Sequence, residues 1–558
     1  MSLPMIPYRL ISATSLAGGY LLSSGRIPQW PQPGFLAAST ALWVAQFLVG
    51  FVWAVILYPK FFSPLRGLPE PSGNSWLMGQ FAAIRKLPTG VPHISWINSI
   101  PNDGLIRYLG MFNQERLMVT SPKSLAEVLV TKNYDFQKPA QVRHTIGRIL
   151  GFGILLAEGE VHKMQRKNLL PSFAFRHIKD LYPLFWEKSC DGVRAMTQQI
   201  LEDASKTPDA KSTAVIEAGS YASRITLDII GLAGLGHDFG AINDPHNPLS
   251  EAYWNLFKPN RQAQILGLIG QVIPPKIIGW LPVQRNADIY AAARLIRAMC
   301  ADLIKEKKEK LARKELVDLD ILSVALESGA FSDENLIDQL MTFLAAGHET
   351  TASAMTWATY LLAKHPEVQA RLRAEVREHL PPISSPEDTT TVSSMDIDRM
   401  TYLNAVCNEV LRYFSPVPLT LRVAACDTSI QGQFVPKGTQ IMLVPWAVNK
   451  SVSLWGDDAL EFNPDRWIPK SSNDKQAASG GATSNFAFLS FLHGPRSCIG
   501  LSFAKAEFCC LLASWVGRFS FELDNKEMMD EEKLDIKGGI TARPAKGMHV
   551  RATVLDGW

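Results

Sequence analysis

The feature that most constrains this 558-residue chain is the decapeptide FLHGPRSCIG at residues 491–500. A single cysteine, Cys498, stands there between two glycines, with an arginine two residues before it. The apolar stretch 501–516 has helical periodicity, which predicts a helix that begins directly after the loop. Backbone N–H groups at a helix N-terminus stabilise a thiolate, and glycine allows positive φ and the close approach of a flat group. The loop therefore predicts a site where one thiolate binds one soft metal ion.

No second metal ligand accompanies Cys498 in the sequence, and this distinguishes between metals. Structural zinc needs four protein ligands, usually in paired spacings such as C-x₂-C. Haem iron takes four nitrogens from its own macrocycle, so one protein thiolate suffices. A lone cysteine is more often an ordinary buried thiol. The residues around Cys498 decide between these interpretations.

The sequence resembles the cytochrome P450 haem-thiolate monooxygenases, whose haem loop reads F-x-x-G-x-R-x-C-x-G. All five fixed positions are matched, by Phe491, Gly494, Arg496, Cys498 and Gly500. The resemblance implies haem b (iron protoporphyrin IX), bound through the Cys498 thiolate as the axial ligand of the iron. We also expect Phe491 to pack beneath the loop and Arg496 to pair with a carboxylate, while both glycines allow positive φ and the close approach of a flat cofactor.

The resemblance covers roughly residues 65 to 555 and implies the cytochrome P450 fold, a single catalytic domain that is mainly α with a smaller β-rich region. Hydrophobic periodicity agrees with this fold class. Amphipathic helices are expected around 175–200, 287–312, 355–380 and 402–414, and short strands at 105–120, 418–424 and 434–444. Two Ser/Thr-rich segments, 381–394 and 471–485, are expected to be solvent-exposed insertions.

The segment from Ser332 to His365 contains no proline and one glycine, which predicts a long helix with Ser332 as its N-cap. The run Ala-Gly-His-Glu-Thr-Thr within it resembles the family's oxygen-activating helix. The resemblance implies that Gly347 leaves room above the iron, that Thr350 hydrogen-bonds dioxygen, and that Glu349 relays protons from water. Splitting the O–O bond requires two protons, so an acid beside an alcohol suits the reaction.

Two other interpretations of this helix are available. The threonines of a buried helix often bond back to the preceding turn without any catalytic role. His348 and Glu349 also begin the zinc-binding pattern H-E-x-x-H, but residue 352 is alanine and the pattern fails.

Glu409 and Arg412 have the i, i+3 spacing that places a carboxylate and a guanidinium on one helical face. Such pairs are common at protein surfaces and weak, so the motif is uninformative alone. The segment FNPDRW at 462–467 resembles the family's P-x-R motif. The resemblance implies that Arg466 joins the other two residues in a buried triad that braces the cysteine loop.

The resemblance also points to partners for the haem propionates. The family often has W-x-x-x-R on an early helix, and here His162 stands in place of the tryptophan while Arg166 keeps the arginine. A further propionate-binding arginine is expected on a strand at Arg422, and Arg496 completes the set. A solvated surface cation is the alternative for Arg166 and Arg422.

Composition agrees with a large folded oxidoreductase. A hydrophobic content of 47% allows a substantial core, and the seven cysteines contain no C-x-x-C pair, as expected for reduced thiols. The net charge of +3, without a dense Lys/Arg run or a Gly-rich phosphate loop, gives no sign of nucleic-acid binding. No Rossmann-type fingerprint or flavin module is present, so electrons must come from a separate protein.

By resemblance, the electron donor is a membrane-bound NADPH–cytochrome reductase. The haem-thiolate face is expected to be its docking surface, with Lys163, Lys167 and Lys505 as candidate basic contacts. Merely solvated lysines are the alternative.

Residues 35–58 are a stretch of 24 residues without a charge, long enough to span a bilayer as a helix. The length of this stretch and the lack of an A-x-A-like site disfavour a cleaved signal peptide. The shorter apolar stretch 10–22, which contains two glycines, is an interfacial segment or a weak first span. We therefore expect a membrane anchor region at 1–58, a proline-rich basic hinge at 59–74 and the haem-thiolate domain at 75–558. Resemblance to microsomal members implies the endoplasmic reticulum membrane, with the catalytic domain facing the cytosol.

The positions that line the family's pocket map to 140–156, Phe343, Ala346, 417–420 and 539–541, and they are mostly small and apolar. They suit a lipophilic small molecule such as a terpenoid, polyketide, alkaloid or fatty acyl chain. The chain is similar to filamentous-fungal members, which favours secondary-metabolite biosynthesis over a fatty-acid or xenobiotic hydroxylase.

Three classes of function are compatible with the haem loop. A monooxygenase that uses O₂ to hydroxylate, epoxidise or desaturate its substrate is favoured by Glu349 and Thr350 together with Cys498. A haem-thiolate isomerase or dehydratase needs no proton relay and usually has an altered acid–alcohol pair. A haem-based sensor needs neither the relay nor the membrane anchor.

Overall fold

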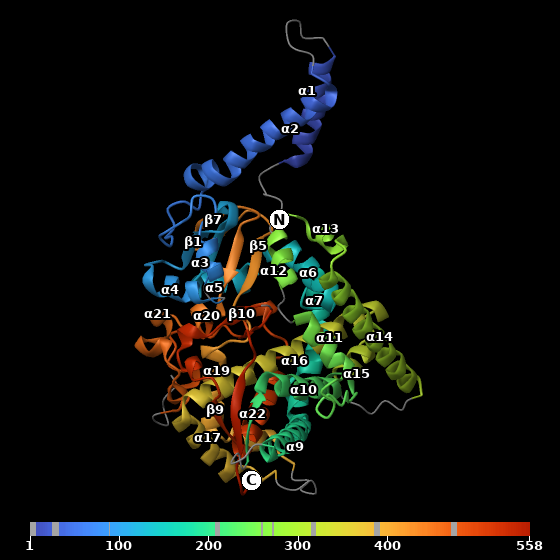
Figure 1. The fold of residues 1–558 in the computed structure, drawn as a ribbon, viewed down its shortest axis with the longest axis vertical. Helices are drawn as coiled ribbons and strands as arrows, with labels where there is room; N and C mark the ends of the chain where they lie inside the picture. The colour runs from blue at the N-terminus through green and yellow to red at the C-terminus, as the bar shows by residue number, and fades with distance from the viewer. Residues whose placement is uncertain are drawn as a thin grey trace.

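The computed structural model describes residues 7–24, 33–86, 88, 90–206, 212–257, 261–270, 273–313, 320–383, 391–469, 477–538 and 540–558. Figure 1 shows two N-terminal helices that project from the body, a β-rich region next to them, and helices that form most of the remainder. The predicted mainly α class with a smaller β-rich region is confirmed.

The projecting helices are α1 (Tyr8–Ser23) and α2 (Phe35–Val52), and α2 continues into a π-helix, η1 (Trp53–Phe62). The α-helices of the body are α3 (Phe81–Lys86), α4 (Val91–Ser99), α5 (Pro122–Ala126), α6 (Ala140–Leu150), α7 (Gly159–Leu169), α8 (Phe175–Asp180), α9 (Tyr182–Ser205), α10 (Ala218–Ile230), α11 (Pro248–Phe257), α12 (Arg261–Ile269), α13 (Pro275–Trp280), α14 (Gln284–Ala312), α15 (Ile321–Glu327), α16 (Asp333–Lys364), α17 (Pro366–His379), α18 (Ser394–Asp398), α19 (Thr401–Tyr413), α20 (Pro445–Val448), α21 (Val452–Trp455) and α22 (Leu501–Arg518).

Three of the four predicted amphipathic segments are matched, by α8 with α9, by α14 and by α19. The fourth segment, 355–380, is helical but divided between two helices. There α16 ends at Lys364 and α17 begins at Pro366, because proline lacks an N–H group and its ring clashes with the preceding turn. The predicted insertions 381–394 and 471–485 lie partly outside the described residues.

Within the described residues, the strands form four small sheets. The largest has the order β1-β2-β8-β5-β3 and is antiparallel except where β2 pairs with β8. Its strands are β1 (Leu105–Leu109), β2 (Glu115–Val119), β8 (Gln440–Leu443), β5 (Thr420–Ala424) and β3 (Phe136–Gln137). The others are the sheet of β4 (Thr213–Glu217), β12 (His549–Val554) and β9 (Phe519–Leu523), and the pairs β6 (Thr428–Ile430) with β7 (Gln433–Val435) and β10 (Ile536–Gly538) with β11 (Ala542–Pro544). All three predicted strand regions contain strands.

The long helix α16 runs through the core and begins where predicted, because the Ser332 side chain accepts a hydrogen bond from the Asn335 backbone N–H. It packs against α10, α14, α19 and α22. Trp357 is fully buried; its ring stacks on Phe414 at a centroid distance of 4.1 Å, and its Nε1 donates to the Ala542 carbonyl at 2.9 Å. These contacts fix the orientation of α16, so each of its residues faces a defined part of the surrounding fold.

The apolar N-terminal helix is longer than the predicted span of 35–58. One helix of 28 residues runs from Phe35 to Phe62 and is long and apolar enough to cross a membrane. Residues 59–62, predicted as the start of the hinge, are helical, because the π-helical hydrogen bonding of η1 accommodates Pro59.

The end of this helix is fixed to the β-rich region. The Arg107 guanidinium of β1 donates to the Pro59 carbonyl at 2.6 Å, and the Asn113 amide donates to the Val55 carbonyl at 2.9 Å. Both side chains are buried. The apolar helix Phe35–Phe62 is therefore joined to the body of the fold by hydrogen bonds as well as by the chain.

Candidate active site

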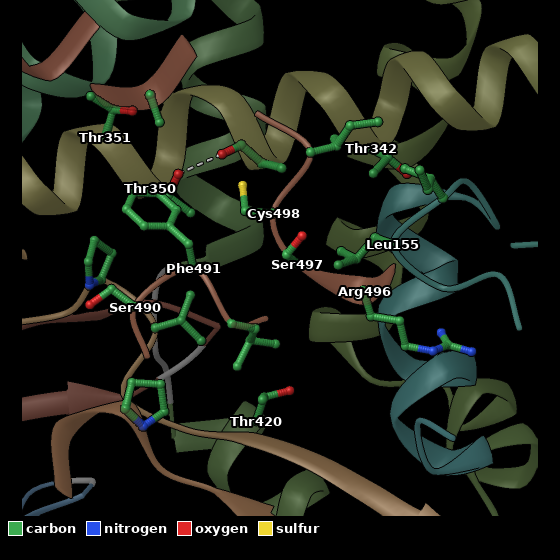
Figure 2. A pocket seen from close by; sticks show the side chains of 18 of the residues that line it. Leu155, Thr342, Thr350, Thr351, Thr420, Ser490, Phe491, Arg496, Ser497 and Cys498 are labelled. Carbon is green, nitrogen blue, oxygen red and sulfur yellow. Dashed lines mark hydrogen bonds between the residues drawn. The ribbon is translucent and has the colours of Figure 1, made fainter. Parts of the chain in front are cut away.

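A cavity of about 310 Å³ lies between α16, the loop before α22 and the largest sheet (Figure 2). Segments far apart in the chain form its walls. Its apolar lining comprises Ile154, Leu155, Phe343, Ala346, Ala354, Leu411, Pro416, Val417, Pro445, Phe491, Leu492, Ile499, Ala504 and Phe508. Within the described residues no carboxylate lines it.

Cys498 projects its thiol into this cavity (Figure 2). The loop is closed by a hydrogen bond from the Cys498 N–H to the Phe491 carbonyl at 2.9 Å, and α22 begins at Leu501 as predicted. The thiol is exposed to the cavity but otherwise enclosed by protein. Burial raises its pKa, whereas the Gly500 N–H and the Arg166 guanidinium lower it. These two groups stabilise the anion that a metal ion requires.

The two glycines of the loop have different roles. Gly494 has a φ of +72°, and a Cβ there would lie 2.2 Å from the Leu129 carbonyl oxygen of η3 (Glu127–Thr131). The backbone at Gly494 therefore packs closely against η3, which leaves no room for a side chain. Gly500 has a φ of −90°, which any residue can adopt, and it caps α22.

The three arginines expected at the cavity all line it. Arg166 donates to the carbonyl and the hydroxyl of Ser497 at 2.7 and 3.1 Å. Arg496 forms an ion pair with Glu158, which is the carboxylate expected for it. Within the described residues, Arg422 donates to the Thr420 hydroxyl and the Leu421 carbonyl of its own strand, and burial lowers its pKa to about 10.

Two further basic side chains line the same cavity. The Nδ1 of His162 lies 3.3 Å from the Tyr134 hydroxyl, and burial lowers the pKa of this histidine to about 4, with nearby cations acting in the same direction. Lys138 was missed by sequence reasoning because no motif marks it. Burial, followed by repulsion from Arg422, lowers its pKa well below the usual value.

These residues fit haem. An apolar cavity with one open thiol supplies a single axial ligand. The basic side chains at the cavity are Lys138, Arg166, Arg422 and Arg496, and in the part of the chain that the structure describes Glu158 is the one carboxylate paired with them. The propionates of haem would neutralise the surplus of positive charge. Among the described residues, no three His, Cys, Asp or Glu side chains gather into a group that could hold a metal ion.

The structure brings Glu409, Arg412 and Arg466 together in the interior. The Glu409 carboxylate is fully buried and accepts hydrogen bonds from Nε and Nη2 of Arg412 at 2.8 and 2.7 Å. The Nε of Arg466 lies 3.4 Å from it. The Asn463 backbone N–H and the Trp467 indole N–H also donate to it, at 2.8 and 2.9 Å.

Asn449, which sequence reasoning missed, links this triad to the segment that leads into the cysteine loop. Its amide donates to the Arg412 carbonyl at 3.1 Å and to the Ser490 hydroxyl at 2.9 Å. Its oxygen accepts from the Leu489 N–H at 2.8 Å. The triad and the loop are therefore connected through one buried amide.

Thr350 and Glu349 lie on different faces of α16. The Thr350 side chain lines the cavity and donates to the Ala346 carbonyl at 2.8 Å (Figure 2). The buried Glu349 carboxylate lines a second cavity of about 380 Å³, where it accepts from the Thr541 hydroxyl at 2.7 Å and pairs with Arg543. Consecutive helical residues point roughly 100° apart. The alcohol thus faces the first cavity and the acid the second.

Comparison with known proteins identifies the family. The family model described as cytochrome P450 matches residues 69–550. The chain belongs to the cytochrome P450 family. It is 45% identical to the cytochrome P450 monooxygenase FUM15 of Gibberella moniliformis, over 90% of each chain. Identity to the cytochrome P450 monooxygenase sphH of Aspergillus fumigatus is 47% over 91% of each chain, and to ALT8 of Alternaria alternata 42% over 98% of this chain and 96% of that one.

This P450 is therefore a haem-thiolate monooxygenase. Gly347 was expected to leave room above the iron, and this expectation is wrong. A Cβ at that position would meet Ile230 of α10 at 2.6 Å. Gly347 thus allows α10 to pack closely on α16 and does not line the cavity.

The predicted substrate pocket of the P450 agrees with the structure in three of its four parts. Cavity-lining residues come from 140–156, from α16 and from 417–420, and they include Ile154, Leu155, Phe343, Ala346, Val417 and Thr420. The fourth part is corrected, since Thr541 faces the second cavity, while residue 539 lies outside the described residues.

One of the three lysines suggested as reductase contacts is not a free surface cation. Lys505 is partly buried, its ammonium donates to Asn408 at 2.7 Å, and burial lowers its pKa. Lys163 and Lys167 on α7 are exposed, and Lys163 lies 2.5 Å from Glu160.

Proposed function

We propose that this P450 oxidises a lipophilic small molecule in fungal secondary-metabolite biosynthesis. In the hydroxylation form of the reaction, one atom of O₂ enters a C–H bond of the substrate and the other leaves as water. NADPH supplies two electrons and, with the medium, two protons. The observation that carries the proposal is the apolar cavity that contains both the Cys498 thiol and the Thr350 side chain.

The chemistry of the cavity supports a substrate recognised by shape and apolar contact. Phe343, Val417 and Leu411 are among its walls, and no carboxylate of the described residues lines it to bind a cationic substrate. The relatives in Gibberella, Aspergillus and Alternaria favour a fungal metabolite over a general xenobiotic.

Bound haem supplies the oxygen-activating chemistry, and the residues of the chain prepare the site for it. Cys498 supplies the thiolate, and the Gly500 N–H and Arg166 stabilise its charge. Lys138, Arg422 and Arg496, which line the cavity, would hold the propionates.

The apolar walls exclude water and keep the substrate over the site. The Thr350 hydroxyl, which now donates to the Ala346 carbonyl, rotates to hydrogen-bond dioxygen. Glu349 collects protons at the second cavity and passes them across α16 by a change of its side-chain rotamer.

Electrons reach this site from a separate membrane-bound NADPH–cytochrome reductase. The exposed lysines Lys163 and Lys167 lie on α7, the helix that also supplies Arg166 to the haem site. The helix Phe35–Phe62 supports anchoring in the endoplasmic reticulum membrane, with the catalytic domain in the cytosol.

The test is an untargeted mass-spectrometric comparison of extracts from the source organism that carries the intact chain or Cys498→Ala. Cys426→Ala is the matched control, because Cys426 is exposed and lies outside the cavity. We expect a compound to accumulate in Cys498→Ala, and the intact and control strains to contain the same compound with one more oxygen atom.

Other outcomes separate the remaining functions. A mass loss of two hydrogens identifies a desaturase within the same proposal. Compounds of equal mass would instead indicate an isomerase, and unchanged extracts a haem-binding sensor; either result would refute the proposal.

A further inference from the structure

We propose that α1 and α2 enter the bilayer together as an antiparallel hairpin, which places the N-terminal end of α1 on the same side of the membrane as the catalytic domain. The inference rests on the proposed membrane anchoring and adds a second embedded helix to it. A single span through α2 alone would place these two parts of the chain on opposite sides.

The contacts between the helices define their direction. Near the start of α1 the ring of Tyr8 lies 6.3 Å from that of Phe47, and near its end Gly19 approaches Ser39. Residue numbers therefore rise along α1 as they fall along α2. The Tyr8 end lies beside the Val52 end of α2, which leads through η1 into the catalytic body (Figure 1).

The polar side chains of the two helices bind one another. Thr14 donates to the Gln46 amide oxygen at 2.7 Å, and the amide nitrogen of Gln46 donates to Ser15 at 3.1 Å. The Trp43 indole donates to Ser12 at 3.2 Å. Hydrocarbon offers no partners for such groups, so hydrogen bonds between helices are favoured there. Because they are paired with one another, the polar side chains of α1 and α2 can enter the apolar bilayer together.

Small residues bring the helix backbones close. A Cβ at Gly19 would lie 2.0 Å from the Ser39 hydroxyl oxygen, and a Cβ at Gly18 would lie 2.7 Å from a methyl carbon of Leu42. Ser15 and Gly19 are buried one turn apart on the same face of α1. Small residues at four-residue spacing are the usual means by which membrane helices associate.

The outer faces of the hairpin match hydrocarbon. Leu10 and Leu16 on α1 are 61% and 52% exposed, and Leu36 and Val49 on α2 are 76% and 71% exposed. The only charged residue of either helix is Arg9. Arg9 lies at the end where Lys60 and Arg66 follow α2, whereas Arg26 alone stands in the sequence between the two helices, so more of the flanking positive charges are on the proposed cytosolic side.

The length of α1 is compatible with this arrangement. Its 16 residues extend about 24 Å, somewhat less than the ~30 Å of the hydrocarbon core. The long side chain of Arg9 can extend to the headgroup region from that end.

Glycosylation mapping of the full-length protein in microsomes tests the hairpin. An Asn-x-Thr acceptor on a flexible spacer is placed before Met1 in one form and within residues 25–32 in another. We expect the second acceptor to be glycosylated in the lumen and the first to remain unmodified. Glycosylation of the first acceptor would overturn the hairpin, whereas failure of the second would overturn the orientation of the anchor itself.

A pair of variants tests the contact between the helices. Gly19→Leu places a side chain against Ser39 and should release α1, so that the acceptor before Met1 becomes partly glycosylated. Leu16→Ala, on the outer face, should leave it unmodified. A carbon-monoxide difference spectrum should be the same for both variants, which shows that the haem domain is intact. An unmodified acceptor in Gly19→Leu would refute the proposed packing.

Discussion

Two buried carboxylates of this P450 differ in how the protein accommodates them. Glu409 is surrounded by the guanidinium groups of Arg412 and Arg466. Glu507 on α22 is also fully buried, but neither of its oxygens has a hydrogen-bond partner within the described residues. Burial raises the pKa of Glu507 well above its usual value, and the nearby Thr351 hydroxyl lowers it by less. Burial therefore favours the neutral form of Glu507, whereas Glu409 belongs to an ion-pair network.

Removal of Glu409 should prevent formation of the haem protein. Glu409→Ala leaves the buried Arg412 guanidinium without its carboxylate, while Arg466 keeps Asp458 at 2.8 Å, and we expect a cost of about 3–5 kcal/mol. We expect no thiolate-type signal in a carbon-monoxide difference spectrum of this variant. Glu461→Ala is the matched control, because the Glu461 side chain is exposed and only its backbone carbonyl binds Arg412. Full haem content in Glu409→Ala would show that the triad does not brace the loop.

Glu507→Gln should change how stability depends on pH. A raised pKa in the folded state means that the unfolded chain loses its proton first, from about pH 4.3 upward. The wild type should therefore lose stability relative to Glu507→Gln as pH rises above about 5, by up to about 1.4 kcal/mol per pH unit until the pKa of the folded state is reached.

Thermal unfolding of the full-length protein in detergent measures this difference at each pH. Glu522→Gln, at an exposed position on β9, is the control and should follow the wild type. Parallel pH curves for wild type and Glu507→Gln would contradict a neutral Glu507.

Thr350→Ala should uncouple NADPH consumption from product formation. The variant lacks the hydroxyl that hydrogen-bonds dioxygen, so we expect at least about a tenfold lower yield of product per NADPH. Thr359→Ala, which removes a buried hydroxyl bonded to the Met355 carbonyl on the same helix, is the control. Equal yields in wild type and Thr350→Ala would exclude a role in dioxygen binding.

At the scale of elements, the contact between α10 and α16 determines what Gly347 does. Gly347→Ala should destabilise the protein by about 1–3 kcal/mol, because the new methyl group overlaps Ile230. In the background of Ile230→Ala the same change should be neutral or stabilising, since alanine favours helix over glycine by about 1 kcal/mol.

A double-mutant cycle measured by thermal unfolding tests this coupling. Additive effects would show that the two residues do not meet. If Gly347→Ala altered substrate binding and left stability unchanged, Gly347 would face the first cavity as the sequence first indicated.

Local signals explain why some elements could be predicted and others could not. The start of α16 follows from Ser332 and its end from the nearby Pro366, and both effects act within one helical turn. The direction of Glu349 could not be predicted, because its partner Thr541 is 192 residues away. The cysteine loop was predictable since its residues are consecutive, whereas Lys138 and Asn449 join the site only through the tertiary fold.

At the scale of the whole molecule, the exposed lysines of α7 should affect electron supply. Lys163→Glu together with Lys167→Glu reverses charge on this helix and should raise the KM for the reductase about tenfold or more at low ionic strength. Chemical reduction of the haem should be unaffected. Lys305→Glu on α14 is the control. An unchanged KM would place the docking surface elsewhere.

The hydrogen bonds from Arg107 and Asn113 to the end of the anchor helix make helix and catalytic body turn together. Tilt of the helix depends on the thickness of the surrounding bilayer. In the proposed anchoring, a thicker or thinner membrane would therefore change the angle at which the catalytic body stands on it. Lipid composition would then set the direction from which a lipophilic substrate dissolved in the membrane approaches the cavity.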